Sequence, residues 1–188
     1  IFNVVMVCIM LPLMKYVVWL SEKLIRGDDL MKEPMKLAYI DEQMLVTPAI
    51  VVPQLIREVE RMGNLSLENI KDSVKAFKTM DQAIIDSVYD REALVDYLNH
   101  EITRYLVKSN QLDLSDEDNV VIGSLFHIVN DLERISDHAE NINDFAVVRM
   151  DKELKYTQEA MDELDIMIKK VAKIVKKSIE IYTTNDIE

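Results

Sequence analysis

The sequence contains few of the residues that interrupt helices. Only three of its 188 residues are glycine and four are proline. Sheet-rich and α/β folds need many tight turns, which draw on both residue types, so their scarcity argues against those folds. Aromatic residues reach only 6%, whereas Leu, Ile, Met, Glu and Lys, most of which favour helices, are abundant. We therefore predict an all-α protein.

The chain also lacks the features of several functional classes. Its single cysteine, Cys8, cannot form an internal disulfide, which fits a reducing compartment. The formal net charge is −12, and phosphate backbones repel such a surface, so we predict no nucleic-acid binding. No G-x-S-x-G motif or glycine-rich phosphate loop occurs, so we predict that the chain is not an enzyme. An acidic surface suits cations or basic partners instead.

Long apolar runs are absent except at the N-terminus. Residues 1–20 are apolar on every side of the helical wheel, with Lys15 as the one charge. About 20 such residues cross the hydrocarbon core of a bilayer. Basic residues follow the run, so the positive-inside rule predicts a transmembrane helix at 1–26 in the cell membrane, with residues 27–188 in the cytoplasm. Lys15 and Pro12 are costly in lipid, which leaves a buried core helix as the alternative. Because the chain starts at Ile1 rather than Met, we expect a fragment or a processed product.

The remaining sequence divides into a linker and a helical region. Residues 27–46 have a poor apolar period and are predicted as a linker. Residues 47–188 carry four amphipathic stretches with short connections, which predicts an elongated up-down helical bundle. Thr47-Pro48, Asp81 and Ser115 are the predicted helix starts. The predicted inward-facing residues are Ile50, Leu55, Ile56, Val59, Met62, Leu67, Ile70, Val74 and Phe77 in the first helix, Ile84, Val88, Leu94, Leu98, Ile102 and Leu106 in the second, Val121, Leu125, Ile128, Leu132, Ile135, Ala139 and Ile142 in the third, and Leu154, Met161, Leu164, Ile168, Val171, Val175 and Ile179 in the fourth.

Two acidic pairs have the spacing of one helical turn. Glu133 and Asp137 are four residues apart, and Asn141 is expected to continue their line. Glu92 and Asp96 repeat the spacing on the preceding helix. Antiparallel packing of the two helices would bring the pairs together, which is how helical bundles build carboxylate metal sites. Because 34 of 188 residues are acidic, such pairs also arise by chance on solvated faces, which is the alternative interpretation.

The three histidines have no partner at the spacing of metal ligands. His100, His127 and His138 are therefore predicted as structural or surface residues. A histidine-kinase or chemoreceptor segment also places long helices after a membrane helix. However, the residues after His138 are Ala139-Glu140-Asn141, not the acidic, basic and proline residues expected around a phosphoaccepting histidine.

Several segments resemble one family. LERISDHAENI, residues 132–142, resembles the signature of PhoU-type domains, with Ser136 where that family often has glycine. Residues 57–74 and 90–106 are similar to the first and second helices of such a domain. Residues 161–182 resemble the start of a second three-helix half, which implies a bundle that is incomplete at its C-terminus.

The N-terminal part sharpens this resemblance. Residues 2–20 are similar to the final membrane helix of bacterial sodium/phosphate cotransporters, and residues 45–54 to their junction with a PhoU-like domain. The resemblance implies the C-terminal part of a sodium-coupled importer of inorganic phosphate, whose cytoplasmic bundle regulates uptake. Phosphate and sodium, the coupling ion, would bind upstream of this sequence. The alternative is a freestanding, membrane-anchored PhoU-like regulator that binds metal, and a homo-oligomer or a regulatory protein partner fits both readings.

The resemblance also implies a cofactor. PhoU-type domains bind multinuclear iron or zinc clusters through acid-x-x-x-Asp motifs, which assigns Glu133 and Asp137 as metal ligands, followed by Glu92 and Asp96. In the similar first-helix segment that begins at Glu60, Asn64 replaces the second acid, which argues against a cluster there.

Overall fold

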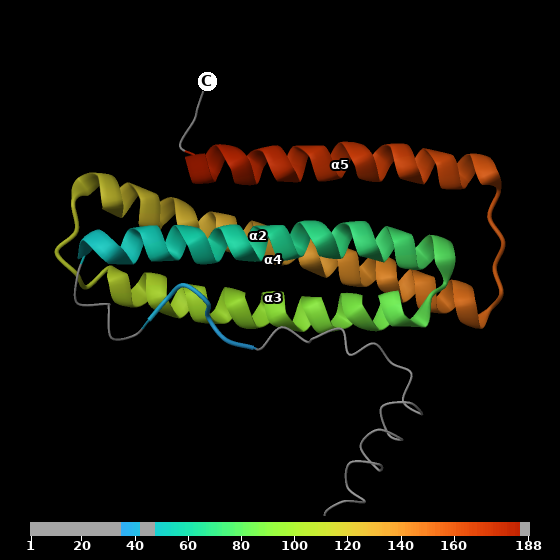
Figure 1. The fold of residues 1–188 in the computed structure, drawn as a ribbon, viewed down its shortest axis with the longest axis horizontal. Helices are drawn as coiled ribbons and strands as arrows, with labels where there is room; N and C mark the ends of the chain where they lie inside the picture. Colours follow the sequence, from blue (N-terminus) through green and yellow to red (C-terminus); the bar gives the residue numbers. More distant parts are fainter. Residues whose placement is uncertain (1–34, 42–47, 185–188) are drawn as a thin grey trace, which may run out of the picture. The chain divides into compact units, whose positions relative to one another are not determined.

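A computed structural model describes residues 35–41 and 48–184, which belong to one compact unit, Glu33–Glu188. Four α-helices follow one another: α2 (Pro48–Thr79), α3 (Gln82–Ser109), α4 (Asp116–Asp151) and α5 (Gln158–Thr184) (Figure 1). The all-α class and the four predicted helices are confirmed for this part of the chain. The predicted transmembrane helix at 1–26 lies outside the described residues. Within the described ranges, no helix combines the length and apolar character that crossing a bilayer requires.

Two predicted helix starts are confirmed by their capping hydrogen bonds. The Asp81 carboxylate accepts the backbone N–H of Ala83 at 2.9 Å, and Asp81 itself has extended backbone angles. The Ser115 hydroxyl accepts the backbone N–H of Asp118 at 3.1 Å. Three acidic residues in the first turn of α4 add a favourable interaction with the helix dipole. Local sequence therefore determines where α3 and α4 begin.

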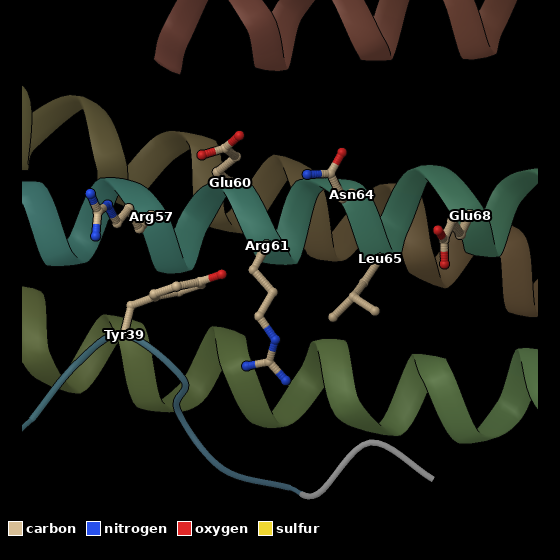
Figure 2. Close-up of a pocket in the computed structure, with 7 residues that line it drawn as sticks. All are labelled: Tyr39, Arg57, Glu60, Arg61, Asn64, Leu65 and Glu68. Carbon is tan, nitrogen blue, oxygen red and sulfur yellow. The ribbon is translucent and has the colours of Figure 1, made fainter. Parts of the chain in front are cut away.

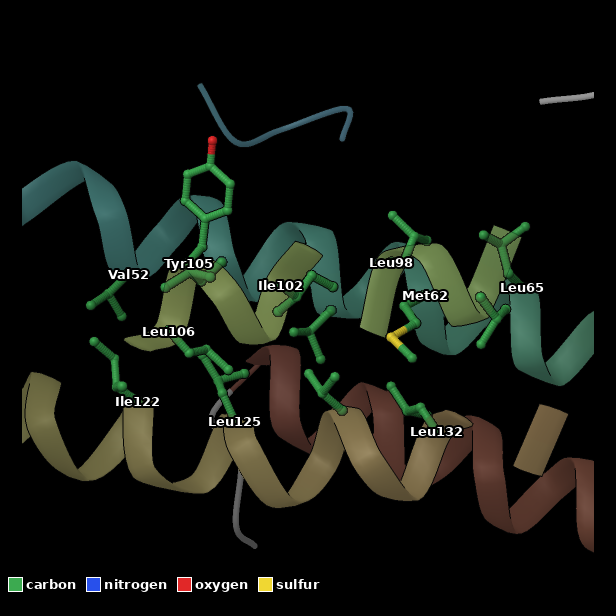
Figure 3. Close-up of a cluster of buried hydrophobic side chains, with 14 of the residues drawn as sticks. Val52, Met62, Leu65, Leu98, Ile102, Tyr105, Leu106, Ile122, Leu125 and Leu132 are labelled. Atoms are coloured by element: carbon green, nitrogen blue, oxygen red, sulfur yellow. The ribbon is translucent and has the colours of Figure 1, made fainter. Parts of the chain in front are cut away.

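The main hydrophobic core lies where α2, α3 and α4 meet. α2 packs against each of the other three helices, which explains why it is buried on most of its circumference. Figure 3 shows side chains of α3 and α4 converging on α2. The fully buried side chains of this core include Leu55, Met62, Val95, Leu98, Ile102, Leu106, Ile122 and Leu125. Burying one such side chain contributes about 1.5–3 kcal/mol, so this cluster supplies much of the stabilisation.

Three residues predicted to face inward are exposed instead. Ile50 lies on a solvent-facing position of the first turn of α2. Leu154 lies in the connection between α4 and α5 rather than in a helix. Val171 lies on α5. This helix packs chiefly on α2, which covers only part of the apolar surface of α5. These predictions were wrong because periodicity identifies an apolar face without showing whether a neighbour covers it.

Gly63 allows α5 to approach α2 closely. α2 continues as a regular helix through this position, so the glycine does not end it. A Cβ at Gly63 would lie 3.0 Å from both the Cγ1 and Cδ1 atoms of Ile179 on α5. Contacts that short force the neighbour to move, so the missing side chain makes room for α5. At the other end of the contact, Lys78 pairs with Asp165 at 2.5 Å.

The segment 35–41, in the predicted linker, is docked on α2. Glu58, which is 0% exposed, accepts hydrogen bonds from the backbone N–H groups of Ala38 (2.8 Å) and Tyr39 (2.7 Å). Arg61 donates to Glu58 at 2.7 Å and to the backbone oxygen of Lys36 at 3.1 Å. Leu37 and Ile40 pack against the main core. The buried carboxylate of Glu58 thus binds the segment to the bundle through hydrogen bonds.

Arg149 links the connection between α4 and α5 to the C-terminal end of α2. Its guanidinium donates to the backbone oxygens of Phe77 and Lys78 in the last turn of α2, and to that of Leu154. It also lies over the rings of Phe77 and Tyr156, at 5.2 and 5.3 Å from their centroids. A cation at this place satisfies carbonyls that a helix end leaves without intrahelical partners.

Candidate functional site

Acidic side chains from α3 and α4 gather along the seam between these two helices. The two helices are antiparallel neighbours, so α3 residues in rising order meet α4 residues in falling order (Figure 1). Tyr89 near the start of α3 donates a hydrogen bond to Asp144 near the end of α4 at 2.6 Å, which sets the register. We call the resulting group the acidic seam; it comprises Glu92, Asp96, Glu133, Asp137, Glu140 and Asp144.

Glu92 experiences the strongest electrostatic perturbation in the seam. Its pKa is raised from 4.5 to about 7, first by partial burial and then by the negative charges of neighbouring carboxylates. Those neighbours are Glu140, Asp96, Asp137 and Glu133, in decreasing order of effect. Four predicted ligands, together with Glu140, therefore lie within electrostatic reach of one another. Near neutral pH, Glu92 is divided between its protonated and ionised forms.

The α4 side of the seam is perturbed in the same direction. Burial raises the pKa of Glu133, with added repulsion from Asp137 and Asp96 and an opposing effect of Arg134. Burial also raises the pKa of Glu140, followed by repulsion from Asp144. Burial, together with neighbouring negative charge, therefore disfavours ionisation of Glu92, Glu133 and Glu140, and a bound cation would relieve the repulsion.

Tyr89 closes one end of the seam. Burial raises the pKa of its phenol to about 12, and the hydrogen bond to Asp144 adds to this rise because it favours the neutral, donating phenol. Tyr89 therefore remains a hydrogen-bond donor throughout the physiological pH range. Sequence reasoning missed this residue because only the register of α3 against α4 pairs it with Asp144.

The line of acids on α4 differs from the prediction in one respect. Asn141 does not continue it: this residue is exposed, and its amide donates to the backbone oxygen of Asp137 at 2.8 Å. Glu140 and Asp144 extend the seam instead. Seven residues are nearly two full turns, whereas eight overshoot them, so Glu140 lies more nearly in line with Glu133 than Asn141 does. Applied strictly, the same periodicity would have identified Glu140 and Asp144.

The carboxylate oxygens of the seam are suitable ligands for a metal ion, but the side chains do not point toward one common centre. Carboxylates are ligands for iron and zinc, and two facing helices provide them here. In the described part of the chain, no three His, Cys, Asp or Glu side chains are arranged to hold a metal ion. The seam carboxylates are only partly buried or exposed, so side-chain rotation is open to them. Binding would require such rotation.

The other candidate positions lie outside the seam. His100, His127 and His138 are all exposed, which agrees with their predicted surface role. Glu60 and Asn64 line a hollow of about 450 Å³ on α2, together with Tyr39, Arg57, Arg61, Leu65 and Glu68 (Figure 2). Its charged side chains are of both signs, and they do not converge on one centre in the view of Figure 2. This hollow therefore defines no ligand chemistry.

Replacing Glu92 by glutamine should flatten the pH dependence of stability. Since folding raises the pKa of Glu92, its favourable contribution is present below pH 4.5 and is lost as the pH rises through about 7. We expect Glu92→Gln to raise the melting temperature at pH 8, with little change at pH 4.5. The measurement is thermal unfolding with a chelator at both pH values.

The matched control is Asp86→Asn, on the exposed part of α3. This variant should retain the pH dependence of the unchanged chain. Equal slopes for Glu92→Gln and the unchanged chain would show that Glu92 is not repelled by the seam.

The comparisons with known proteins converge on one family. Residues 59–146, which contain the whole seam, match the family model described as PhoU domain. The chain is 26% identical over 137 residues to a "Phosphate-specific transport system accessory protein PhoU homolog" of Clostridium acetobutylicum, covering 72% of this chain and 61% of that protein. It is 24% identical to "PhoU homolog 1" of Thermotoga maritima, covering 70% and 56%. No solved structure matches.

A shorter match is somewhat more similar. Over 99 residues the chain is 32% identical to a PhoU homologue of Caulobacter vibrioides, covering 53% of this chain and 42% of that protein. The chain thus spans between 42% and 61% of the length of these curated relatives. The helices that carry the acidic seam are thus similar to a PhoU domain.

Proposed function

We propose that this chain regulates phosphate transport through its PhoU-like bundle. The observation that carries the proposal is the PhoU domain match over residues 59–146, because this range contains every residue of the acidic seam. The relatives are accessory proteins of a phosphate-specific transport system by name. An acidic helical bundle of this kind acts by binding a cation or a protein partner rather than by catalysis.

The finer form of the proposal concerns the whole protein. The apolar run at 1–20, followed by a PhoU-like bundle, supports a C-terminal portion of a sodium-dependent phosphate transporter in the cell membrane. Residues 27–188 would then lie in the cytoplasm, and phosphate and sodium would bind upstream. The second candidate is a freestanding, membrane-anchored regulator. The names of the relatives, which describe accessory proteins, favour a regulator over a transporter.

The acidic seam is the proposed regulatory site. Glu133, Asp137, Glu92 and Asp96 would supply oxygen ligands to iron or zinc, with Glu140 as a further ligand. The raised pKa values of Glu92, Glu133 and Glu140 support this assignment: burial is their largest cause, and the neighbouring carboxylates add a repulsion that a bound cation would relieve. Cation binding would draw α3 and α4 together at the seam, and so change the surface that a partner protein meets.

The test combines metal content with phosphate uptake. In cells that produce the protein, Glu133→Ala with Asp137→Ala should lower bound iron or zinc at least severalfold, measured by elemental analysis of the purified chain. The same variant should weaken the change in [³²P]phosphate uptake between low and high external phosphate. Asp86→Ala with Asp90→Ala, an exposed pair of the same spacing on α3, is the matched control and should change neither quantity.

The ionic composition of the medium separates the two candidates. A transporter tail should alter only the uptake that is lost when choline replaces sodium. An accessory regulator should alter uptake equally in both media. Unchanged metal content in the double variant would reject the seam as a metal site, and unchanged uptake regulation after removal of residues 48–184 would reject the regulatory role.

A further inference from the structure

The segment 35–41 lies in a groove formed by α2 and α3. The segment is neither helix nor strand, and its Leu37 and Ile40 side chains pack against the main core between these two helices. Figure 3 shows Tyr105 of α3 pointing toward the side of the bundle on which the segment runs. In Figures 1 and 2 the segment and α5 lie on opposite sides of α2, so this groove is separate from the contact between α2 and α5.

Two side chains of α2 bind the main chain of the segment. The Glu58 carboxylate accepts the consecutive backbone N–H groups of Ala38 and Tyr39 at 2.8 and 2.7 Å. The Arg61 guanidinium donates to the backbone oxygen of Lys36 at 3.1 Å. Hydrogen bonds to the main chain are largely independent of the sequence of the bound segment. The groove therefore presents polar groups that recognise an extended polypeptide.

The buried carboxylate of Glu58 determines what kind of molecule the groove accepts. Its Oε1 atom accepts from Arg61 at 2.7 Å, whereas its Oε2 atom accepts both N–H groups of the segment. Glu58 is 0% exposed, and a buried carboxylate oxygen without donors is strongly unfavourable. A metal ion fits this place less well, because the guanidinium of Arg61 would repel it. The groove thus selects a segment that offers backbone N–H groups.

A hollow directly beside the segment provides room for a larger occupant. Tyr39 of the segment and Arg61 of α2 both line the hollow of about 450 Å³ on α2 (Figure 2). Arg57 and Glu60 add charges of opposite sign to its lining. An occupant with a further polar side chain at this place would gain contacts that the segment 35–41 does not make.

We propose that the groove is a docking site for an extended segment of a partner protein, and that segment 35–41 occupies it as an intramolecular competitor. The partner segment carries two apolar side chains three residues apart with free backbone N–H groups between them, as Leu37 and Ile40 flank Ala38 and Tyr39. It binds when the chain's own segment leaves, and contacts in the hollow favour it over that segment. The inference goes beyond the regulatory role proposed above and does not depend on metal binding at the acidic seam.

The probe for this groove is a capped, fluorescent peptide of residues 35–41, whose binding to the 188-residue chain in mild detergent is measured by anisotropy. Leu37→Asp in the chain should release its own segment and strengthen peptide binding by roughly tenfold or more, because a covalently attached segment competes at an effective concentration of roughly 1 mM. Met35→Asp is the matched control: Met35 is 57% exposed on the same segment, so this variant should bind the peptide as weakly as the unchanged chain. Equal binding by all three chains, or binding by none, would overturn the proposal.

Recognition of the main chain is tested by a second substitution. Adding Glu58→Gln to Leu37→Asp should abolish the gain in peptide binding, whereas adding Glu60→Gln should preserve it. Circular dichroism establishes that each variant retains its helices. Peptide binding that survives Glu58→Gln would reject the carboxylate as the recognising group and overturn the proposal.

The unchanged chain provides a test that needs no variant. With the chain labelled with ¹⁵N, an excess of unlabelled peptide should speed hydrogen exchange at the amides of Ala38 and Tyr39, and unaltered protection would contradict displacement. Exchange of segments between two copies is the alternative occupancy. It would appear in light scattering as a concentration-dependent mass that Leu37→Asp removes, and this result would assign the groove to a second copy and overturn the proposal.

Discussion

Replacing Arg149 by methionine is expected to lower the free energy of unfolding by about 3–4 kcal/mol, because the buried partners of a charged group are left without it. The change removes donors to the backbone oxygens of Phe77, Lys78 and Leu154. Methionine keeps much of the aliphatic volume, so the loss reports the guanidinium rather than a cavity. For a chain of this size the melting temperature should fall by roughly 10 °C.

The position of Arg149 explains why its replacement should lower the free energy of unfolding more than replacement of an exposed arginine. Arg149 is 9% exposed and contacts the rings of Phe77 and Tyr156, which also pack against each other at a centroid distance of 5.2 Å. The arginine thereby joins the end of α2, the end of α4 and the connection to α5. Its loss should loosen the N-terminal end of α5 first, visible as faster hydrogen exchange at residues 152–160.

Arg134→Met provides the matched control. Arg134 is on the same helix, but its side chain is 71% exposed and forms a long ion pair with Asp131, at 3.9 Å. Exposed pairs of this kind contribute about 0–1 kcal/mol, so the melting temperature should hardly change. Thermal unfolding followed by circular dichroism measures both variants. Equal small effects would show that the cluster around Arg149 does not stabilise the bundle.

Replacing Glu58 by glutamine should cost about 3 kcal/mol and detach the segment 35–41, because it removes the fully buried anion of a hydrogen-bonded ion pair. The carboxylate accepts from Ala38, Tyr39 and Arg61. A glutamine amide has one acceptor oxygen, and its NH₂ group would face donors. The backbone N–H groups of Ala38 and Tyr39 would then lose their carboxylate acceptor, which favours release of the segment into water.

Hydrogen exchange identifies this local effect directly. The backbone amides of Ala38 and Tyr39 should exchange much faster in Glu58→Gln, while those in the middle of α3 change less. Glu60→Gln is the control, since Glu60 is exposed on the same helix and a substitution there should stay within about 0.5 kcal/mol. Protected amides of Ala38 and Tyr39 in Glu58→Gln would mean that Leu37 and Ile40 alone hold the segment.

Sequence reasoning was strongest where the cause is local. The capping roles of Asp81 and Ser115 could be predicted because an N-cap depends on residues within one turn. Periodicity alone predicted five buried positions of α3, namely Val88, Leu94, Leu98, Ile102 and Leu106. On α4 it predicted only three of the buried positions, Leu125, Leu132 and Ala139, because the contact with α2 and α3 is centred about one residue away from the predicted face. The pairing of Glu92 and Asp96 with Glu133 and Asp137 followed from the antiparallel order that short connections impose.

Sequence reasoning was weakest where a residue's environment comes from distant parts of the chain. Glu58 and Arg149 are charged residues that periodicity does not place in a core, and both are buried. Their partners lie 19 and 72 residues away, at Tyr39 and Phe77. The exposure of Val171 could not be predicted either, because it depends on how many helices surround α5.

Helical period, capping and short connections are local properties, so the all-α class, the four helices and the facing acidic residues of α3 and α4 could be predicted from the sequence. The burial of Glu58 and Arg149, the docking of segment 35–41 on α2 and the exposure of Val171 on α5 became evident only from the packed fold. Burial and pKa depend on every element packed around a side chain, whereas periodicity describes only the element that carries it.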